Sequence, residues 1–564
     1  MTENVPSTVG TYIAARLEQI GLRHYFAVPG DYTLVLLDEL LKNPCLQMIS
    51  CCNELNAGYA ADGYARATGG AAAVVVTFSV GGLSVINAIA GAYAEDLPLV
   101  VISGGPNTNS EAECEVLHHT LGLLDYGYQR DVFRRVTAEA LIVHNPADAP
   151  REIDLAIDTA LSKRKPVYLE VACNIAKVPI SAAHARSFDG HLRSDPRSLE
   201  DAVEHAAALL NEATKPVLVA GVKLRSYRAV EAFRTLAEAS GYGVAVMPNA
   251  KGLFDEQSEH YLGIYWGPVG SPGCAEIVES ADLVLFAGAT FTDYTTTGHA
   301  ALANPARMIQ ARPDGVILPG QTFNEVALPD FLRALAPRLQ RNDTSLGAYR
   351  RIREDILPMK PGPAEAPLTT RQLFARVGKL LDAKSAVIAE TGDSWFNGMR
   401  LDLPTGAAFE IQMQYGSIGW SVGATLGYAL GRPERRVITL VGDGSFQLTA
   451  QEVSTMIRYG LRPILFLINN GGYTIEVEIH DGPYNNIKNW HYAELMRVFS
   501  AEDGNGWGTR VRTEGELDAA IAKAVKHDGP AMIECLIDRD DCSKQLLEWG
   551  MHVAKNNGRP LRVV

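Results

Sequence analysis

The sequence predicts an α/β protein made of three doubly wound domains, each with a parallel sheet. The first third of the chain alternates short apolar strands with helix patterns, as in residues 24–30 followed by 33–41 and residues 46–51 followed by 53–67. Such alternation is typical of a parallel sheet with helices on both faces. Two further sets of apolar strand patterns follow, at 216–222, 242–248 and 281–289, and at 385–391, 435–444, 463–470 and 530–537. A chain of 564 residues is also too long for one core.

Two segments interrupt the strand and helix patterns and are expected to be linkers. Residues 177–198 lose the pattern, and residues 341–367 are polar and become rich in proline near their end. We therefore expect an N-terminal domain at 1–185, a middle domain at 195–345 and a C-terminal domain at 365–564.

Charge and cysteine usage narrow the class of protein. The formal net charge of -14 argues against nucleic acid or an anionic membrane surface as a partner. The eight cysteines show neither a CxxC pair nor zinc-type spacing, and the first ten residues lack the pattern of a signal peptide, so we expect a cytoplasmic protein. Residues 71–94 are uncharged and long enough to span a bilayer, but Gly81-Gly82 breaks the run. A strand followed by a helix is therefore the favoured interpretation, and no membrane contact is expected.

A lone acid, Asp443, lies between two glycines directly after the apolar run at 437–441. A glycine-flanked turn after a strand suggests phosphate binding, but the P-loop supplies a lysine, and residues 437–457 contain neither lysine nor arginine. An anion bound here would therefore need another source of positive charge.

The next strand supplies a second candidate ligand. A helix pattern at 449–460 begins with Thr449 and Glu452 at the spacing of a capping box and stops at Gly460, and the strand at 463–468 ends in Asn469-Asn470. Strand, helix and strand form a right-handed crossover, which brings both strand ends to one edge of the sheet. A carboxylate and an amide oxygen suit magnesium, so Asp443 and Asn470 predict a magnesium site. An EF-hand is excluded because its alternating acids are missing.

The spacing of GDG and NN resembles the thiamine diphosphate-binding motif, and the resemblance extends along nearly the whole chain. It includes GDYTLVLLDEL (30–40), CNELNAGYAADGYARA (52–67), VLHHTLG (116–122), AETGDSWF (389–396) and NNGGYTIE (469–476). These segments resemble the thiamine diphosphate-dependent 2-oxo acid decarboxylases, in particular the bacterial pyruvate decarboxylases. The sequence departs from that pattern at Gly471, where relatives carry a larger residue.

The resemblance implies thiamine diphosphate and Mg²⁺ as cofactors, with a pyrimidine-binding N-terminal domain and a diphosphate-binding C-terminal domain. It implies that Asp443, Asn470 and the carbonyl of Gly472 ligate magnesium and that the backbone amides of Gly444 and Ser445 meet the diphosphate. It also implies that Glu54 hydrogen-bonds the pyrimidine ring nitrogen. Further cofactor contacts are implied for Gly416, whose carbonyl faces the exocyclic amine, for Ile418, the apolar wedge under the bent cofactor, and for Thr391, Asp393, Tyr473 and Ile475.

Four further residues are implied to act on the substrate. Asp31, His118, His119 and Glu476 would position its carboxylate and protonate the enamine before the aldehyde leaves. Each of these residues, and Glu54 as well, also has a plain structural explanation. Asp31 could cap a helix, Glu54 could stabilise a helix dipole, the two histidines could be solvated loop residues and Glu476 could be an exposed acid. The joint match to the family pattern favours the catalytic interpretation.

The expected reaction is the non-oxidative decarboxylation of pyruvate to acetaldehyde and carbon dioxide, as in ethanol fermentation. The alternatives are a decarboxylase for bulkier acids such as indolepyruvate or phenylpyruvate, an acetolactate synthase-like carboligase, and a catalytically silent scaffold. Large residues expected in the substrate pocket, Tyr294, Trp395, Ile475 and Ile479, favour pyruvate. The resemblance also implies a homotetramer, a dimer of dimers with active sites between subunits.

Overall fold

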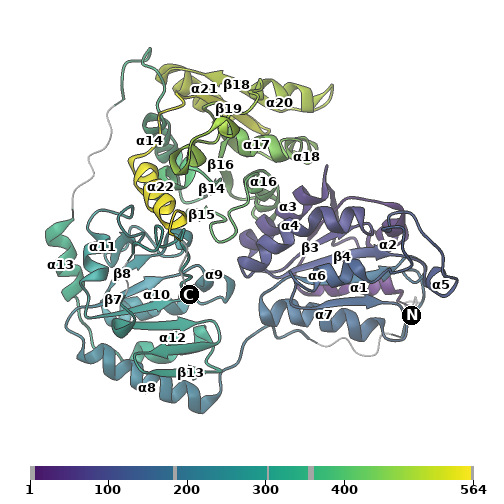
Figure 1. Cartoon of the computed structure of the whole chain (residues 1–564), viewed down its shortest axis with the longest axis horizontal. Coiled ribbons are helices and arrows are strands. Elements are labelled where there is room, and N and C mark those ends of the chain that lie inside the picture. The colour runs from purple at the N-terminus through teal and green to yellow at the C-terminus, as the bar shows by residue number, and fades with distance from the viewer. Residues whose placement is uncertain (1–6, 182–186, 302–303, 354–360, 561–564) are drawn as a thin grey trace. The chain divides into compact units, whose positions relative to one another are not determined.

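The computed structural model describes residues 7–181, 187–301, 304–353 and 361–560 (Figure 1). The chain divides into two compact units, each described by itself below. The first comprises the chain up to His191 together with 419–433 and 449–461, and the second comprises 192–418, 434–448 and the chain from Arg462 onwards.

The first unit is built around a six-stranded parallel sheet with the order β2-β1-β3-β4-β6-β5. Its strands are β1 (His24–Ala27), β2 (Gln47–Ser50), β3 (Ala72–Val76), β4 (Leu99–Gly105), β5 (Ala140–Val143) and β6 (Val167–Ala172). The two central strands, β3 and β4, are buried along their whole length, which is why they appear in the sequence as continuous apolar runs.

Helices cover both faces of this sheet, namely α1 (Val9–Gln19), α2 (Leu34–Leu40), α3 (Glu54–Thr68), α4 (Val80–Ala94), α6 (Tyr128–Phe133) and α7 (Ala149–Lys163). The unit also contains α5 (Thr108–Ala112), α16 (Trp420–Gly431), which packs on α3, and α18 (Glu452–Arg458), which packs on α16. Successive side chains of a strand point to opposite faces. Ala73 and Val75 of β3 join a core with α1, α2 and α7, whereas Val74 and Val76 are buried outside that core, on the face of α3 and α4.

Helices α3 and α16 approach each other closely because glycines line their contact. A Cβ atom on Gly427 would lie 1.8 Å from the carbonyl oxygen of Ala60, and one on Gly63 would lie 2.2 Å from that of Ala424. Any larger side chain at these two positions would push the helices apart. The small-residue composition of both helices is therefore a packing requirement of the first unit.

The second unit contains a seven-stranded sheet with the order β13-β12-β11-β10-β7-β8-β9. The strands are β7 (Pro216–Ala220), β8 (Gly243–Val246), β9 (Tyr261–Ile264), β10 (Leu283–Ala287), β11 (Met308–Arg312), β12 (Gly315–Leu318) and β13 (Gln321–Asn324). Strands β7 to β11 are parallel, and β12 and β13 add antiparallel pairs at one edge. The turns at Pro313-Asp314 and Pro319-Gly320 reverse the chain over two residues each, which explains this edge.

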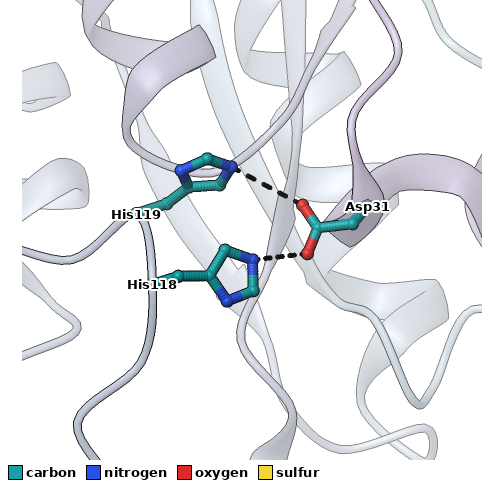
Figure 2. Close-up of side chains that lie close together, drawn as sticks. All are labelled: Asp31, His118 and His119. Carbon is teal, nitrogen blue, oxygen red and sulfur yellow. Dashed lines mark hydrogen bonds and ion pairs between the residues drawn. The ribbon is translucent and has the colours of Figure 1, made fainter.

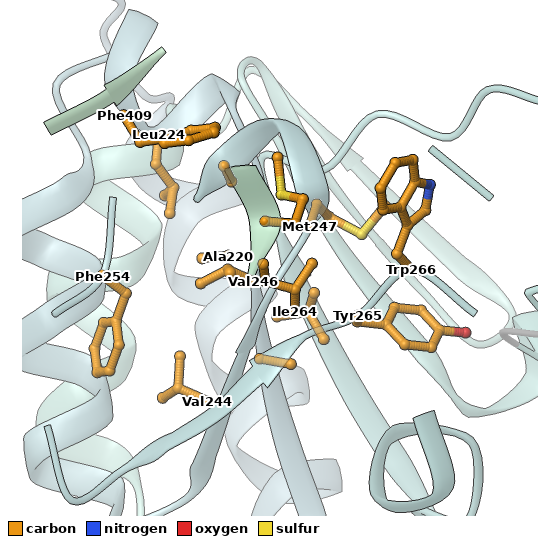
Figure 3. Packing of buried hydrophobic residues seen from close by; sticks show 14 of the residues in the cluster. Ala220, Leu224, Val244, Val246, Met247, Phe254, Ile264, Tyr265, Trp266 and Phe409 are labelled. Atoms are coloured by element: carbon orange, nitrogen blue, oxygen red, sulfur yellow. The ribbon is translucent and has the colours of Figure 1, made fainter. Parts of the chain in front are cut away.

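The core of this sheet includes buried residues of the strands and of the helices that accompany them. Figure 3 shows Val246 of β8 beside Ile264 of β9, with which it pairs, and both residues belong to the buried core. The helices are α8 (Pro196–Glu212), α9 (Lys223–Ser226), α10 (Val230–Ser240), α11 (Cys274–Glu279), α12 (Leu328–Leu335) and α13 (Thr344–Ile352).

A third sheet, also in the second unit, is fully parallel and has the order β15-β14-β16-β17-β19-β18. The strands are β14 (Ser385–Ala389), β15 (Ala408–Glu410), β16 (Arg436–Gly442), β17 (Ile464–Asn469), β18 (Trp507–Val511) and β19 (Ala531–Leu536). Its remaining helices are α14 (Thr370–Leu380), α15 (Asp393–Met399), α17 (Asp443–Thr449), α19 (Thr474–Ile479), α20 (Tyr492–Ser500), α21 (Glu514–Lys526) and α22 (Lys544–Asn557).

The predicted fold class is confirmed, and the structure corrects one local prediction. Thr449 and Glu452 do not form a capping box, because Thr449 ends α17 and its hydroxyl donates to the carbonyl oxygen of Gly419 at 2.8 Å. The Glu452 carboxylate instead accepts the backbone N–H of Cys52 at 3.3 Å. Gly460 does follow the end of α18 in the left-handed conformation that the sequence predicts for a helix stop.

The uncharged segment at 71–94 forms β3 and α4, as the sequence indicates. Among the described residues, no helix combines the length and the apolar character that a membrane span needs. Of the two predicted linkers, the second contains α13, and residues 182–186 and 354–360 of the two linkers lie outside the described residues.

Candidate active site

The acid of the GDG segment, Asp443, lies at the first position after β16 and is 1% exposed. Its Oδ1 accepts the backbone N–H of Gly444 at 2.8 Å, and its Oδ2 accepts that of Gly471 at 2.7 Å. Because Gly471 follows β17, the ends of β16 and β17 meet, as the crossover predicts. Burial raises the pKa of Asp443 to about 6, against the opposing effect of these backbone donors.

Gly471 is suited to its position by conformation. Its φ is 79°, in the left-handed region that favours glycine, and a Cβ there would meet no atom within 4 Å. Its departure from the family pattern therefore leaves open space beside the acid, and its N–H donor to Asp443 is retained.

A cavity of about 400 Å³ opens at these two strand ends. Thirteen of the residues expected to contact cofactor or substrate line it, namely Tyr294, Thr391, Asp393, Gly416, Ile418, Asp443, Gly444, Ser445, Asn470, Gly472, Tyr473, Ile475 and Glu476. Its other lining residues, Gly392, Ser394, Gly442, Ile468 and Thr474, come from the same segments. Within the described residues, none of the side chains lining it is a lysine or an arginine, so the cavity offers a buried carboxylate and no cationic side chain.

The ligand set at the cavity fits a magnesium ion. The amide nitrogen of Asn470 donates to the Thr474 hydroxyl at 2.5 Å, which leaves the amide oxygen as the group that can serve a cation. Gly472 is required because a Cβ there would lie 2.4 Å from the carbonyl oxygen of Asn485. One carboxylate, one amide oxygen and one backbone carbonyl are hard oxygen donors, and a divalent cation would compensate the buried charge of Asp443. The sequence did not indicate Thr474, which orients Asn470.

The beginning of α17 presents backbone amides to the same cavity. The N–H of Gly444 is donated to Asp443, so Ser445, which is 5% exposed, is the better placed of the two predicted diphosphate donors. The ring of Tyr473 packs on Gly444, where a Cβ would lie 2.4 Å from it. Only glycine at position 444 therefore leaves room for the Tyr473 ring, which lines this part of the cavity.

Asp393 and Thr391 follow β14 at the cavity wall. The carboxylate of Asp393 accepts from the amide of Asn397 at 2.7 Å and from the Ser543 hydroxyl at 2.5 Å, and burial raises its pKa to about 6. These bonds tie the start of α15 to the start of α22. No spacing in the sequence links residues 393 and 543, so Ser543 could not have been predicted.

The expected substrate-pocket residues separate into two groups. Tyr294 and Ile475 line the cavity, whereas Trp395 and Ile479 are not among its lining residues. Trp395 is fully buried and packs edge to face on Tyr294, with the ring centroids 6.0 Å apart. Its Cη2 atom would lie 3.9 Å from a Cβ on Gly416, so the indole stands directly behind the cavity wall. Ile479 is half-buried against the core.

Glu476 lies in the first turn of α19 and is exposed at the edge of the cavity. The other predicted catalytic residues, Asp31, His118, His119 and Glu54, belong to the first unit.

Asp31 and the two histidines come together in the first unit although 86 residues separate Asp31 from the first of them. Figure 2 shows the Asp31 carboxylate pointing at both rings, with one oxygen toward each. Its Oδ2 lies 2.6 Å from Nε2 of His118, and its Oδ1 lies 3.7 Å from Nε2 of His119. Asp31 begins the short 3-10 helix η1 (Asp31–Thr33) after β1, and the histidines lie in the segment between β4 and α6. A carboxylate bridging two imidazoles can orient both rings for proton transfer.

Glu54 is the first residue of α3, and the side chain of Asn53 caps this helix by accepting the N–H of Leu55 at 2.8 Å. A Cβ on Gly81, in the first turn of α4, would lie 3.3 Å from Oε1 of Glu54. The carboxylate therefore lies against the beginning of α4, where a larger residue than glycine would crowd it.

Comparisons with known proteins agree with this arrangement. The family model of the thiamine pyrophosphate enzyme N-terminal TPP binding domain matches residues 7–127, that of the central domain matches 203–335, and that of the C-terminal TPP binding domain matches 390–535.

Three plant relatives match over almost their whole length. Pyruvate decarboxylase 4 of Arabidopsis thaliana is 52% identical over 567 residues, covering 99% of this chain and 94% of the relative. Pyruvate decarboxylase 1 of Oryza sativa subsp. indica is 51% identical, covering 99% and 93%, and pyruvate decarboxylase 1 of Zea mays is 51% identical, covering 98% and 92%. These relatives support the family rather than its bacterial members in particular. The chain therefore belongs to the thiamine pyrophosphate enzymes and, among them, to the pyruvate decarboxylase family.

Proposed function

We propose that this chain catalyses the non-oxidative decarboxylation of pyruvate to acetaldehyde and carbon dioxide, the reaction of ethanol fermentation. The observation that carries the proposal is the cavity at the ends of β16 and β17, where a buried carboxylate and neighbouring oxygen donors suit a metal-bound diphosphate. Relatives that are about half identical over nearly the whole chain are named pyruvate decarboxylases, which supports pyruvate over the bulkier acids and over carboligation.

The cofactors proposed are Mg²⁺ and thiamine diphosphate. Asp443, Asn470 and the Gly472 carbonyl would hold the metal, and Ser445 would meet the diphosphate at the start of α17. When bound, thiamine diphosphate supplies the electron sink that a 2-oxo acid needs in order to lose carbon dioxide.

The remaining cavity residues would hold the organic part of the cofactor. Gly416, with φ of 68°, presents its backbone at the cavity wall and would accept from the exocyclic amine. Ile418 would support the bent cofactor, and Thr391, Asp393, Tyr473 and Ile475 would complete its surroundings. Glu54 would share a proton with the pyrimidine nitrogen, a role that needs a carboxyl group rather than an amide.

Proton transfer to and from the substrate is assigned to Asp31, His118, His119 and Glu476. The contact of 2.6 Å between Asp31 and His118 fixes which ring nitrogen faces the carboxylate and leaves the other nitrogen to exchange a proton. Glu476, exposed at the cavity edge, would meet the substrate carboxylate or protonate the product.

A direct test is carbon dioxide and acetaldehyde release from pyruvate by the purified protein with thiamine diphosphate and Mg²⁺. Parallel reactions would use phenylpyruvate, indolepyruvate and an excess of chelator. We expect turnover with pyruvate, much slower turnover with the aromatic acids, and none after the metal is removed. Faster turnover of an aromatic acid, or acetolactate as the main product, would overturn the proposal.

We also propose a homotetramer, a dimer of dimers whose active sites lie between subunits. Four large apolar side chains around the histidine pair, Val116, Leu121, Leu123 and Leu124, are each more than half exposed, which supports a subunit contact there.

Mixing two inactive variants, Glu54→Gln and Asp443→Ala, tests the shared sites. If each site takes Glu54 from one subunit and Asp443 from the other, a mixed dimer contains one intact site. Random exchange of subunits should then restore about a quarter of wild-type activity, as symmetry-related interfaces require. No recovery after demonstrated subunit exchange would place both residues of a site in the same subunit.

We further propose a cytoplasmic location. All eight cysteines are free, and three of them, Cys45, Cys52 and Cys114, are exposed, which is typical of a reducing compartment. Fractionation of cells expressing the chain, with a cytoplasmic marker enzyme, would test this proposal.

A further inference from the structure

The histidine pair lies on a segment with little regular structure of its own. Residues 106–127 connect β4 to α6 and contain the single short helix α5. His119 has a φ of 62°, in the left-handed region. This conformation is unfavourable for a residue other than glycine and persists where the surrounding structure holds it.

Tyr32 holds the first histidine. Its hydroxyl donates to the backbone carbonyl oxygen of His118 at 3.3 Å, and its ring stacks on the imidazole with 5.0 Å between centroids and 14° between planes. Tyr32 follows Asp31 in η1, so a single turn supplies the carboxylate to the rings and the hydroxyl to the backbone. Burial, and secondarily the charge of Asp31, raises the pKa of Tyr32 to about 12 and keeps it a donor at neutral pH.

Tyr128 holds the second histidine. Its hydroxyl lies 3.2 Å from the carbonyl oxygen of His119 and 2.6 Å from Oγ of Ser79. A tyrosine hydroxyl has one proton, and a carbonyl oxygen can only accept. The Tyr128 hydroxyl is the donor in both contacts, so its one proton serves the His119 carbonyl oxygen and the Ser79 hydroxyl in alternation. Burial raises the pKa of Tyr128 as well.

A buried hydrogen-bond network holds Ser79, the residue that the Tyr128 hydroxyl contacts. The backbone N–H of Ser79, a residue that also has a positive φ of 54°, donates to Oε1 of Gln129 at 2.5 Å. The Gln129 amide in turn donates to Ser103 at 3.0 Å and to Tyr168 at 2.5 Å. Gln129, Ser103 and Tyr168 are fully buried, so the network is rigid compared with the exposed segment that it supports.

The two tyrosines are also linked to each other. The buried ring of Phe78 lies edge to face with Tyr32 at 6.0 Å and with Tyr128 at 5.8 Å between centroids. The row Tyr32, Phe78 and Tyr128 therefore forms an aromatic support, from which one hydroxyl reaches each histidine carbonyl.

We propose that Tyr32 and Tyr128 are positioning residues, whose hydroxyl groups hold the backbone of His118 and His119 so that both imidazoles face the Asp31 carboxylate. The proposal rests on the proposed function for its effect on turnover, but the geometry that it explains does not depend on the substrate. Neither tyrosine is required to touch substrate or cofactor.

The test is a double-mutant cycle on the holoenzyme. Tyr128→Phe keeps the ring and removes the hydroxyl, and we expect kcat for pyruvate to fall about tenfold, the scale of one net hydrogen bond. In a His119→Ala background the same change should lower kcat by less than about twofold, because Tyr128 acts through His119. Tyr12→Phe is the matched control, since the Tyr12 hydroxyl donates to Asp154 in the same unit, and it should leave kcat unchanged.

Two kinetic results would overturn the proposal. One is a folded, cofactor-loaded Tyr128→Phe enzyme whose kcat stays within about twofold of wild type. The loss of one hydrogen bond should lower kcat about tenfold, so a change this small would show that the bond does not support turnover. The other is an equal loss in the presence and absence of His119, which would assign the effect of Tyr128 to general stability. If Tyr128→Phe does not fold, the cycle of Tyr32→Phe with His118→Ala decides between the same outcomes.

Proteolysis supplies a readout that does not need activity. Glu113 and Glu115 are exposed in the segment 106–127, so a glutamate-specific protease should cut Tyr128→Phe several-fold faster than wild type or Tyr12→Phe. Equal cutting rates would overturn the proposal. If the wild type failed to decarboxylate pyruvate while the cutting rates differed as expected, the proposed function would fail and the positioning role would stand.

Discussion

The parallel sheet of the first unit and that of the C-terminal region share one strand order. Numbered within each sheet, both read 2-1-3-4-6-5, as β2-β1-β3-β4-β6-β5 and as β15-β14-β16-β17-β19-β18. Site residues follow equivalent strands in both. Asp31 follows β1 and Thr391 follows β14, Glu54 follows β2 and Gly416 follows β15, and the histidine segment follows β4 as Asn470 follows β17. One topology therefore presents two different chemistries at the carboxyl ends of its strands.

The two sheets differ in how far their functional residues lie from the strands. Asp443 and Asn470 are the first residues after β16 and β17, and backbone amides orient the Asp443 carboxylate within the protein. His118 lies thirteen positions beyond the end of β4, and its side chain is 60% exposed. A residue that binds a cation benefits from a rigid, buried position next to a strand. A proton-transfer residue on a long connecting segment such as 106–127 needs side chains from elsewhere to hold it, here Tyr32 and Tyr128.

The largest expected effect concerns the buried side of this comparison. Asp443→Ala should abolish magnesium-dependent retention of thiamine diphosphate, because no lysine or arginine among the described lining residues can replace the cation. Loss of a residue that only hydrogen-bonds a metal ligand already lowers metal affinity about 10 to 100-fold. We therefore expect removal of the ligand itself to lower the magnesium-dependent affinity for thiamine diphosphate by more than about a hundredfold. Calorimetric titration with the cofactor, with and without Mg²⁺, measures it. Asp38→Ala, an exposed acid, is the control, and unchanged affinity in Asp443→Ala would remove Asp443 from the site.

Glu54→Gln tests the first unit and should separate binding from chemistry. The amide keeps the size of the side chain but cannot share a proton with the pyrimidine nitrogen, so we expect turnover to fall about a hundredfold while the affinity for thiamine diphosphate changes little. Steady-state kinetics and the exchange rate of the cofactor's C2 proton check it. Normal exchange in the variant would leave Glu54 with the plain role of an acid at a helix start.

The comparison also explains what the sequence could predict. Asp443, Asn470 and the meeting of their strand ends followed from apolar runs, glycine turns and crossover handedness, since these residues lie next to long buried strands. Asp31 and His118 are 87 residues apart and lie on turns, so resemblance to a family, and no spacing rule, brought them together. The tyrosines that hold the histidines carried no signal, because no spacing relates Tyr32, in the turn after β1, or Tyr128, at the start of α6, to the histidine pair.

The sequence missed strands both inside the sheets, such as β6 and β11, and at or near their edges. Strand β15 has three residues, and β13 is mostly exposed, so neither shows the apolar run that predicts a central strand. The capping box failed for a different reason. Thr449 found a tertiary acceptor at Gly419, which no local pattern reveals. The local capping rule therefore failed where a long-range partner competes.

Trp395→Ala tests whether the buried indole behind the cavity wall limits the size of the substrate. The indole stands behind Tyr294 and Gly416, so its removal should let the wall yield to a larger substituent. We expect kcat/KM for phenylpyruvate relative to pyruvate to rise about tenfold, in line with about 1 to 3 kcal/mol per methylene in an apolar pocket. The ratio within one preparation cancels losses from partial unfolding. Trp420→Ala, which removes a buried tryptophan in the first unit, should leave the ratio unchanged. A Trp395→Ala ratio within about twofold of wild type would make this tryptophan a core residue only.

The smallest effect comes from two glutamates at the fourth position of equivalent strands, Glu170 in β6 and Glu534 in β19. Both are almost fully buried. The Glu534 carboxylate accepts from the Asn469 amide at 2.8 Å and from the N–H of Ala493 at 2.9 Å, and it forms an ion pair with Arg510 at 3.1 Å. The Glu170 carboxylate accepts from the Tyr168 hydroxyl at 2.5 Å. Burial raises the pKa of Glu170 to about 7, against the effect of this hydroxyl and the charge of Arg130.

Glu170 should therefore make the first unit less stable as the pH rises. The folded state keeps this proton up to about pH 7, whereas in the unfolded chain the glutamate has its ordinary pKa of 4.5. Between these two pH values the folded state therefore holds more protons than the unfolded chain. Its stability consequently falls as the pH increases. Between pH 6 and 7 the loss is about 1 kcal/mol, a few degrees in Tm. Glu170→Gln keeps an acceptor for Tyr168 and should remove this part of the pH dependence, so that the difference in Tm between variant and wild type grows toward pH 8. Glu534→Gln should instead lower Tm at every pH, because it leaves Arg510 without its buried partner. Scanning calorimetry from pH 5.5 to 8 measures all three proteins, and a constant difference between Glu170→Gln and wild type would show that Glu170 stays ionised in the folded protein.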